Sequence, residues 1–283
     1  MFDFKNHTHI MAVLNVTPDS FSGDGICSNS VIDRALKQAE SFVKAGCHIL
    51  DIGGESTRPG ATPVSLQEEL DRVIPIIQAI HKNFDIPISI DTMKAIVADQ
   101  AVKCGASIIN DVSGLLHDPE MVHIAAKGQC YIIIMHSFNA GIVEKTRLGG
   151  CYIKNDIDES EDIIVCIYRD LDKQVLFALE NGIDPSKIIL DPGIGFGKTV
   201  EQNIEIMARF DEIPKFRYPV LLGASRKSFI GYTINAPVDK RLGGSLAALT
   251  VGIMKGAQIV RVHDVEESVQ AAKIVDAIMK YKN

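Results

Sequence analysis

The sequence lacks the marks of a membrane protein, a secreted protein and a general nucleic-acid-binding protein. No run approaches the roughly 18 uninterrupted apolar residues that a membrane-spanning helix needs. Residues 1–5 are not a basic flank leading into an apolar core and a small-residue cleavage site. The 36 Asp and Glu residues outnumber the 29 Lys and Arg, and a net charge of −7 disfavours broad attraction to nucleic acid or an anionic membrane. We therefore expect a cytoplasmic protein with no nucleic-acid or membrane partner, in which any anion site is built locally.

The sequence also lacks the spacings typical of cysteine-dependent structure. Its six cysteines include no C-x-x-C pair, and no H-E-x-x-H pattern is present. A chain of 283 residues, of which 46% are hydrophobic, has ample material for a core and does not need disulfide staples. We predict reduced thiols and no zinc site. Because no linker or low-complexity tract interrupts the chain, we also predict a single domain over residues 1–283.

Eight short apolar runs rich in β-branched residues are typical of buried strands. Within them, apolar residues follow one another instead of alternating with polar ones, which indicates burial on both faces, and most runs end in a polar residue. The predicted strands are His9–Asn15, Ile49–Gly53, Ile86–Asp91, Ser107–Asp111, Tyr131–His136, Ile188–Asp191, Val220–Ser225 and Ile259–Asp264.

Stretches with helical spacing separate these strands. Ser65 and Glu68 are spaced as a capping box, and the helix that they open has one apolar face, with Pro75 as an expected kink. Similar apolar faces are predicted within residues 31–43 and 269–278.

Strand and helix alternate along the whole chain, which predicts an α/β fold. Parallel strands need crossover helices, and eight such units in about 250 residues form a closed TIM (β/α)8 barrel. The alternative is a doubly wound open sheet. That fold calls for a Gly-rich fingerprint after the first strand, where this sequence has Asn15-Val16-Thr17-Pro18-Asp19. The barrel is therefore favoured.

In a barrel of this kind, the residues that close each strand converge on one rim, where active sites lie. A dozen polar side chains at one rim would be costly to desolvate without a ligand, so a polar substrate is indicated. Those residues are Asn15, Asp51, Asp91, Asn110, Asp111, His136, Asp191, Ser225, Arg226, Lys227, Arg261 and His263.

Basic residues gather after particular strands of this acidic chain. Arg58 follows the second strand, Arg226 and Lys227 follow the seventh, and Arg261 and His263 lie at the eighth. The loops after the last two strands hold phosphate in many barrels. The cluster therefore predicts an anion site, and scattered surface salt bridges are the alternative.

The glycine-rich segment 193–199, G-I-G-F-G-K-T, does not match a nucleotide-binding loop. Such a loop needs a glycine five residues before its G-K, and that position is Pro192. We interpret the glycines as allowing the backbone to pass close to a flat ligand. The segment 53–60, G-G-E-S-T-R-P-G, is interpreted as a loop from which Arg58 reaches a bound anion.

Seven segments, in order from the first strand to the last, together resemble the dihydropteroate synthase family. Each is weak alone, but seven in register are specific and cover nearly the whole chain. They are Asn15-Val16-Thr17-Pro18-Asp19-Ser20-Phe21-Ser22, Gly53-Gly54-Glu55-Ser56-Thr57-Arg58-Pro59-Gly60, Ser89-Ile90-Asp91-Thr92, Ile109-Asn110-Asp111, Leu190-Asp191-Pro192-Gly193, Ser225-Arg226-Lys227-Ser228 and Arg261-Val262-His263-Asp264.

The resemblance implies condensation of 6-hydroxymethyl-7,8-dihydropterin pyrophosphate with 4-aminobenzoate in folate synthesis, giving dihydropteroate and pyrophosphate with the help of Mg²⁺. It implies that Asn15 binds the metal and that Asp91, Lys227, Arg261 and His263 are the catalytic residues. A buried pterin needs a partner for each ring donor and acceptor, and two carboxylates, an amide and a lysine supply them. The implied pterin and diphosphate residues are Thr57, Asp91, Asn110, Met135, Asp191, Gly223, Lys227, Arg261 and His263.

The second substrate and the assembly state also follow from the resemblance. A homodimer through outer helices is implied, and residues 244–256 and 265–282 mix apolar and polar positions in a way that would allow it. Sulfonamides mimic 4-aminobenzoate in the family, so they are expected to compete with it here. The implied 4-aminobenzoate residues are Thr57, Arg58, Pro59, Phe196, Lys227 and Ser228.

Two segments depart from the family pattern. Residues 21–27 read F-S-G-D-G-I-C where the family has D-G-G directly after the serine, which puts the role of Asp24 in doubt. Residues 137–160 form a long polar stretch, which we interpret as a solvated excursion, with an altered loop near the pterin as the alternative.

Two other functions remain open, a pterin-dependent methyltransferase barrel and a non-catalytic pterin-binding barrel. Neither would use the cluster of basic residues.

Overall fold

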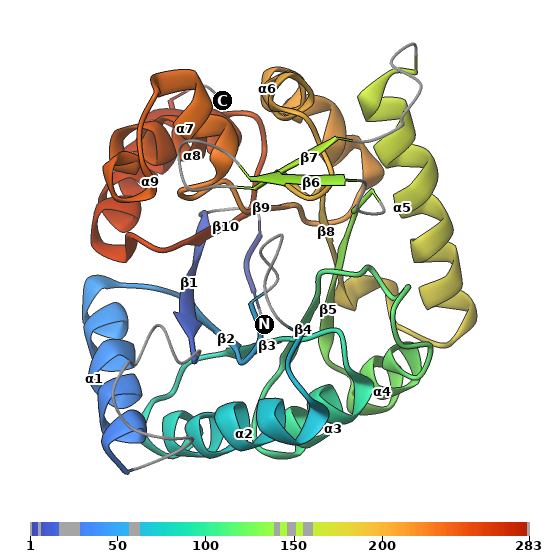
Figure 1. Ribbon diagram of the computed structural model, residues 1–283, viewed down its shortest axis with the longest axis vertical. Coiled ribbons are helices and arrows are strands. Elements are labelled where there is room, and N and C mark those ends of the chain that lie inside the picture. The colour runs from blue at the N-terminus through green and yellow to red at the C-terminus, as the bar shows by residue number, and fades with distance from the viewer. Residues whose placement is uncertain are drawn as a thin grey trace.

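The computed structural model has eight parallel strands surrounded by helices (Figure 1). It describes residues 2–4, 7–16, 29–56, 63–138, 142–145, 151–154 and 161–281, with the side chains of residues 29, 142–145, 151–154 and 214–216 left out of that description. The strands are β1 (His9–Asn15), β2 (Ile49–Gly53), β3 (Ile88–Asp91), β4 (Ile108–Asp111), β5 (Tyr131–Met135), β8 (Ile188–Asp191), β9 (Leu221–Leu222) and β10 (Ile259–Val262).

The strands form one sheet in the order β8-β5-β4-β3-β2-β1-β10-β9. Leu190 on β8 pairs with Val220 just before β9, so the two edges of the sheet meet and the barrel closes. This confirms the predicted barrel and its eight strands. The seventh strand is much shorter than the predicted Val220–Ser225, because its backbone leaves the ladder after Leu222 and turns toward the next helix.

Helices separate the strands and cover the outside of the barrel (Figure 1). The α-helices are α1 (Asn29–Ala45), α2 (Leu66–Asn83), α3 (Ala95–Lys103), α4 (Met121–Gly128), α5 (Ile163–Glu180), α6 (Val200–Ala208), α7 (Ser228–Ile234), α8 (Leu242–Met254) and α9 (Val265–Met279). No helix within the described residues is both long and apolar enough to cross a membrane.

Two local expectations about the helices need correction. Ser65 caps α2 by accepting from the Glu68 backbone N–H at 3.3 Å, but the Glu68 carboxylate pairs with Arg72 and does not complete a capping box. The capping box instead opens α6, at Thr199. On α9, Ile278 was expected on the buried face and is 58% exposed, because the helix extends beyond the layer that it covers.

The core has an outer and an inner part. The larger part lies between the strands and the helices, and a smaller one fills the amino-terminal half of the barrel with Met11, Ile49, Ile108 and their neighbours. Phe2 and Phe4 pack against this inner cluster from below, and Phe2 lies edge-on to Tyr131 at 5.2 Å between ring centroids. The inside of the barrel is therefore apolar at this end, and its polar residues lie toward the other.

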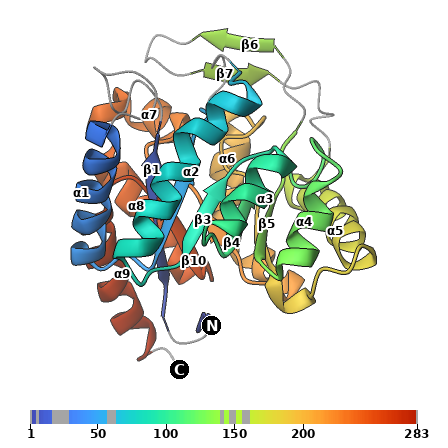
Figure 2. The same ribbon diagram turned by 90° about the horizontal axis from the view of Figure 1, so that it is seen from below.

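The polar stretch after β5 contains a short antiparallel hairpin that the sequence did not predict, made of β6 (Ile142–Lys145) and β7 (Cys151–Lys154). Figure 2 shows it at the end of the barrel opposite the two chain termini, which is the end where the strands finish.

Elsewhere in the chain, Cys47, Cys104, Cys130 and Cys166 are free thiols, as predicted for them.

Candidate active site

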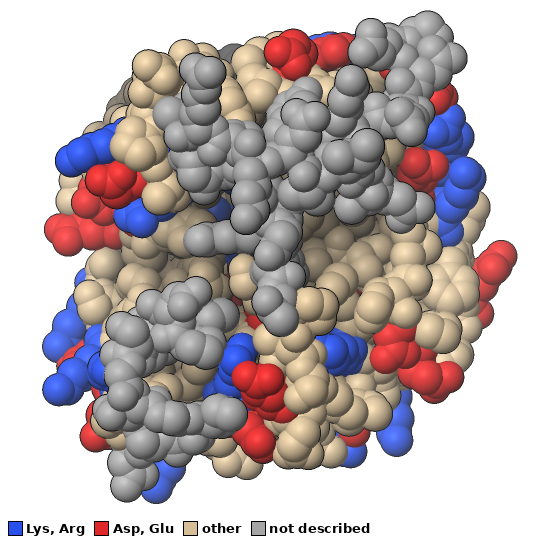
Figure 3. Space-filling view, viewed as in Figure 1, with Lys and Arg blue, Asp and Glu red and all other residues tan. Residues whose placement is uncertain are grey.

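The carboxyl ends of the strands bring polar side chains together inside the barrel. Successive residues of a strand point to opposite faces, so every second residue points inward. The strand register places Gly53 beside Asp91, Asp91 beside Asn110, and Met135 beside Asp191. Five neighbouring strand ends therefore contribute to one surface. Figure 3 shows this face of the molecule, hollowed near its centre and ringed by charged side chains.

Arg261 on β10 lies between two carboxylates. Its Nε donates to Asp51 Oδ2 at 2.6 Å and its Nη2 donates to Asp91 Oδ2 at 2.6 Å. Burial alone would lower the pKa of the guanidinium, but Asp51 and Asp91 outweigh it and raise this pKa above its usual range. Two contacts at different nitrogens fix the plane of a guanidinium as well as its position.

Asp91 has one oxygen engaged and one available. The side chain is 7% exposed, and its Oδ1 has no hydrogen-bond partner among the described residues. Burial raises the pKa of this carboxyl to about 7, with Arg261 acting against the rise and Asp51 adding to it. A buried acceptor without a partner is costly, so the atom suits a ligand that donates a hydrogen bond.

Asp191 and Lys227 form the other side of the site. Asp191, at the end of β8, is 6% exposed and accepts from the Gly193 N–H at 2.7 Å. Lys227 donates from Nζ to the Ile194 carbonyl. Burial lowers the pKa of Lys227 to about 8, while the Asp191 carboxylate acts in the opposite direction. Burial likewise raises the pKa of Asp191, against the effect of Lys227.

Gly223 lies between these two groups. A Cβ atom placed on it would lie 3.7 Å from Lys227 Nζ and 3.9 Å from Asp191 Oδ2. A larger residue would therefore fill the space beside both polar groups. Met135 is 1% exposed on the neighbouring strand, so its thioether belongs to the wall of the site.

Asn15 ends β1 next to Gly53 in the strand register. A Cβ on Gly53 would lie 3.7 Å from both Asn15 Oδ1 and Asp91 Oδ2, so the glycine keeps the space next to these oxygens free of a side chain. Hard oxygen donors of this kind suit Mg²⁺, which keeps several waters and needs few protein ligands. The donor set therefore fits the metal that the sequence predicts.

Three further predicted residues, His263, Phe196 and Ser228, lie around the same opening. His263 is partly exposed after β10, and its backbone N–H and Nδ1 both contact Ser225 Oγ at 3.2 Å. Phe196 is partly buried, with Lys227 Nζ 4.5 Å from its ring centroid, and Ser228 begins α7. Thr57, Arg58, Pro59 and Asp24 lie outside the described residues.

Three side chains expected at the rim have other tasks. Asp111 accepts hydrogen bonds from the turn after β4, and His136 points toward α5, where its Nε2 is 3.5 Å from Asp170. Arg226 was expected near a phosphate, but it pairs with Asp264 through Nε at 2.9 Å. Asp264, in the loop after β10, therefore pairs with the charge of Arg226, and the sequence spacing did not reveal this pair.

The sequence did not assign a role to Lys198, which is 4% exposed. Its Nζ donates to the carbonyls of Gly193 at 2.9 Å and of His136 and Phe196 at 3.2 Å. Gly193 has φ +68°, and a Cβ there would lie 1.8 Å from the His136 carbonyl oxygen, so only glycine allows this close approach. The lysine and the glycine together fix the loop that holds Asp191 and Phe196.

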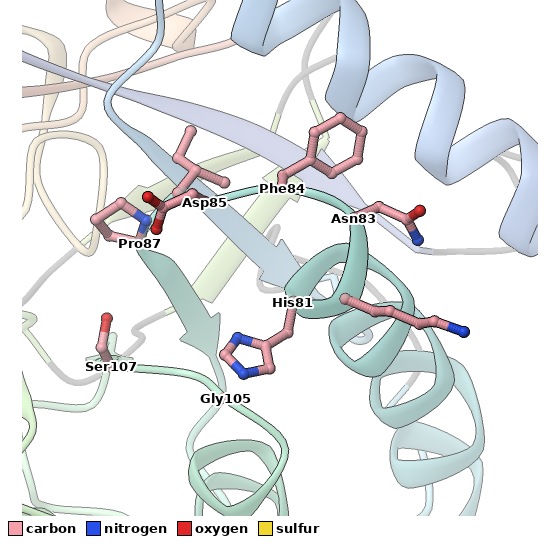
Figure 4. Close-up of a pocket in the computed structure, with 9 residues that line it drawn as sticks. His81, Asn83, Phe84, Asp85, Pro87, Gly105 and Ser107 are labelled. Carbon is pink, nitrogen blue, oxygen red and sulfur yellow. The ribbon is translucent and has the colours of Figure 1, made fainter.

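A separate hollow of about 490 Å³ lies at the other end of the barrel. Figure 4 shows around it His81 and Asn83 from the last turn of α2 and Asp85 from the loop that precedes β3. Residues at this end of a barrel serve stability and not catalysis. The candidate site is therefore the cluster at the carboxyl ends of the strands.

The chain is similar to known proteins both in sequence and in structure. Residues 11–263 match the family described as pterin binding enzyme. The dihydropteroate synthase of Clostridium beijerinckii is 45% identical over 99% of this chain and 97% of its own length, and that of Bacillus subtilis is 45% identical over 98% and 90%. The crystal structure of a dihydropteroate synthase from Clostridium difficile with pteroic acid superposes with a TM-score of 0.89, at 43% identity over 98% of this chain and 99% of that one.

Proposed function

Because the chain belongs to the pterin-binding enzyme family, and within it to the dihydropteroate synthases of folate synthesis, we propose roles for the individual residues of its site. The observation that carries the proposal is the group of Asp91, Asn110 and Asp191, buried inside the barrel at the strand ends, with Lys227 beside them at the start of α7. Two carboxylates, an amide and an ammonium match the alternating donors and acceptors of a dihydropterin edge. In this proposal, Met135 and Gly223 also line the space for the pterin, and Thr57 completes this part of the site.

In this proposal, Asp91 and Asp191 accept hydrogen bonds from ring N–H groups. Lys227 spends one of its three N–H donors on the Ile194 carbonyl, which leaves two for ligands. Arg261 lies flat against the pterin face, because a guanidinium held at two nitrogens has a fixed plane. The neutral ring thus meets a complementary polar edge.

The diphosphate is the leaving group. His263, two residues beyond Arg261, contacts it together with Arg261 and, from the loop after β2, Thr57. Asn15 would hold the Mg²⁺, with diphosphate oxygens and water as its other ligands, and the bound metal would stabilise the charge of the departing pyrophosphate.

The reaction exchanges one bond for another at the exocyclic methylene of the pterin. The bond to the diphosphate oxygen breaks early, and the positive charge that develops spreads into the ring, where the Asp91 carboxylate stabilises it. Arg261 favours the charged form of Asp91 through its bond to Oδ2. The arylamine nitrogen then attacks and releases a proton. An arylamine is unprotonated at neutral pH, so no strong general base is required.

The 4-aminobenzoate ring needs an apolar surface and its carboxylate needs a donor. Phe196 supplies the surface, and Lys227 and Ser228 supply donors at the same edge. Thr57, Arg58 and Pro59 from the loop after β2 complete this subsite. Sulfonamides, which share this shape and charge, compete for it.

An assay of pyrophosphate release tests the proposed reaction. The purified protein should release pyrophosphate only when the pterin diphosphate, 4-aminobenzoate and Mg²⁺ are all present, and omission of any one should stop it. Equal release without the arylamine would show simple hydrolysis of the ester and reject condensation as the activity.

We also propose that the enzyme is a homodimer that buries the outer faces of α8 and α9, which pack side by side. Met254, Ile274 and Ile278 are 46%, 63% and 58% exposed, and Ile274 and Ile278 are four residues apart on one face of α9, so a partner subunit could bury them. Sedimentation should give twice the mass of one chain, and Ile274→Glu should halve it. A wild-type chain that sediments as a monomer at micromolar concentration would contradict this.

A further inference from the structure

Asp51 is a buried carboxylate that connects two residues of the proposed pterin site. It is 0% exposed, inside the barrel on β2. Its Oδ2 accepts from Arg261 Nε at 2.6 Å and from Asn110 Nδ2 at 3.3 Å. The strand register places it two residues before Gly53, which is the residue level with Asp91. Asp51 therefore lies one layer below the groups that face the opening.

The contact with Asp51 decides which end of the Asn110 amide faces the ligand. A carboxylate only accepts hydrogen bonds, so it holds the amide nitrogen and turns the amide oxygen away from itself. With Asp51 at the bottom of the site, that oxygen is available to a ring N–H above. If the amide turned over, its oxygen would meet the carboxylate oxygen and its N–H groups would meet the ring donors. Both contacts would be unfavourable.

The same carboxylate also orients Arg261. Asp51 contacts Nε and Asp91 contacts Nη2, so the guanidinium is held at two corners. Asp91 alone would leave the plane free to rotate about one contact. A cation whose flat face lies against a flat ring depends on the direction of that plane.

We propose that Asp51 is a positioning residue of the synthase, which fixes the acceptor end of Asn110 toward the pterin and the plane of Arg261 against its face. This rests on the pterin roles proposed above for those two residues. Asp51 itself does not touch the substrate in this arrangement.

The test uses Asp51→Asn, which keeps the shape of the side chain. It replaces a carboxylate, which only accepts hydrogen bonds, with an amide, which can also donate them. Calorimetry with 6-hydroxymethyl-7,8-dihydropterin as the probe should show an affinity about tenfold weaker than wild type, because one buried pair is lost. Ser89→Ala is the matched control. Ser89 pairs with Asp51 in the strand register, and its buried Oγ has no partner within the described part of the chain, so its removal should leave the affinity unchanged.

A double-mutant cycle distinguishes positioning from a general structural effect. In the Asn110→Ala background there is no amide to orient, so Asp51→Asn should cost clearly less than tenfold. Equal losses in both backgrounds, or an unchanged affinity in the single variant, would overturn the proposal. Absence of pterin binding by the wild-type protein would instead reject the proposed site as a whole.

Thermal unfolding shows whether each variant is folded. Removing the charge of Asp51 leaves the partly buried Arg261 with one carboxylate partner, and this imbalance can prevent folding. If Asp51→Asn does not melt cooperatively, the same cycle is measured in the Arg261→Gln background, where both charges are removed together. The coupling with Asn110 should persist there, and its loss would refute the orienting role.

Discussion

Replacing Asp191 by Asn tests the proposed pterin contact most directly. The carboxylate is buried and already accepts from the Gly193 N–H, so its second oxygen is the atom assigned to the ring. An asparagine keeps the Gly193 contact through its amide oxygen and turns N–H donors toward the ring. The substitution therefore changes one acceptor into a donor and leaves the shape of the site intact.

The expected size of the effect follows from the burial of Asp191. A hydrogen bond to a charged group contributes about 1.5–3 kcal/mol, and a buried donor without a partner costs about 1–3 kcal/mol. We therefore expect the lost hydrogen bond alone to weaken pterin affinity by about 10- to 100-fold, and the unpaired ring donor to weaken it further, as measured by calorimetry at pH 7. Because Asp191 also opposes the lowering of the Lys227 pKa, the variant should lower the pKa of Lys227 further. Pterin binding by the variant should then weaken with rising pH at lower pH values than in the wild type.

Asp111→Asn is the matched control. Asp111 is another buried carboxylate at a strand end, but its oxygens accept from the backbone of the following turn. Its replacement should lower the free energy of unfolding by about 1–2 kcal/mol and leave pterin affinity unchanged. If Asp191→Asn bound pterin as well as the wild type, Asp191 would not contact the ring and the proposed orientation of the substrate would be wrong.

Two further predictions concern the anion and the stability of the fold. Arg261→Lys should weaken binding of the pterin diphosphate more than binding of the bare pterin. A lysine cannot contact Asp51 and Asp91 and still face the diphosphate. Equal losses of affinity for both ligands would contradict this. Burial lowers the pKa of His9 to about 4 in the folded protein from 6.5, so the unfolded chain takes up a proton first as the pH falls. The stability that neutral His9 contributes is complete above pH 6.5 and is lost toward pH 4, which amounts to about 2 kcal/mol between pH 7 and pH 5. Urea unfolding of His9→Gln should show a smaller loss than the wild type over that interval, and an identical loss would refute the assignment.

The barrel could be predicted from the sequence because its signal is local. Each strand is a short apolar run, and the residue that ends the run is polar, so both the strands and the rim can be recognised one segment at a time. The prediction was wrong where the backbone leaves the ladder early, as after Leu222. A strand ends where its hydrogen bonds to neighbouring strands stop, and the hydropathy of the sequence does not show that point.

The partners of the rim residues could not be predicted in the same way. Arg261 meets Asp51, which lies 210 positions away, and Arg226 meets Asp264 from the next loop. Sequence spacing places such residues at the same end of the barrel but does not tell which pairs neutralise each other. Lys198 had a recognisable signal in its G-K pair. Its use became clear only from the three carbonyls that it contacts.

The pairing of charges separates the two halves of the proposed substrate. Inside the barrel, the carboxylates of Asp51, Asp91 and Asp191 face the cations of Arg261 and Lys227, so the region assigned to the ring carries no net positive charge. Such a region suits a neutral pterin and does not by itself attract a diphosphate. Arg261 therefore needs help in holding the charged tail, and His263 and a metal beside Asn15 supply it nearer the opening. This is why bare pterin and its diphosphate should respond differently to substitutions at the bottom and at the mouth of the barrel.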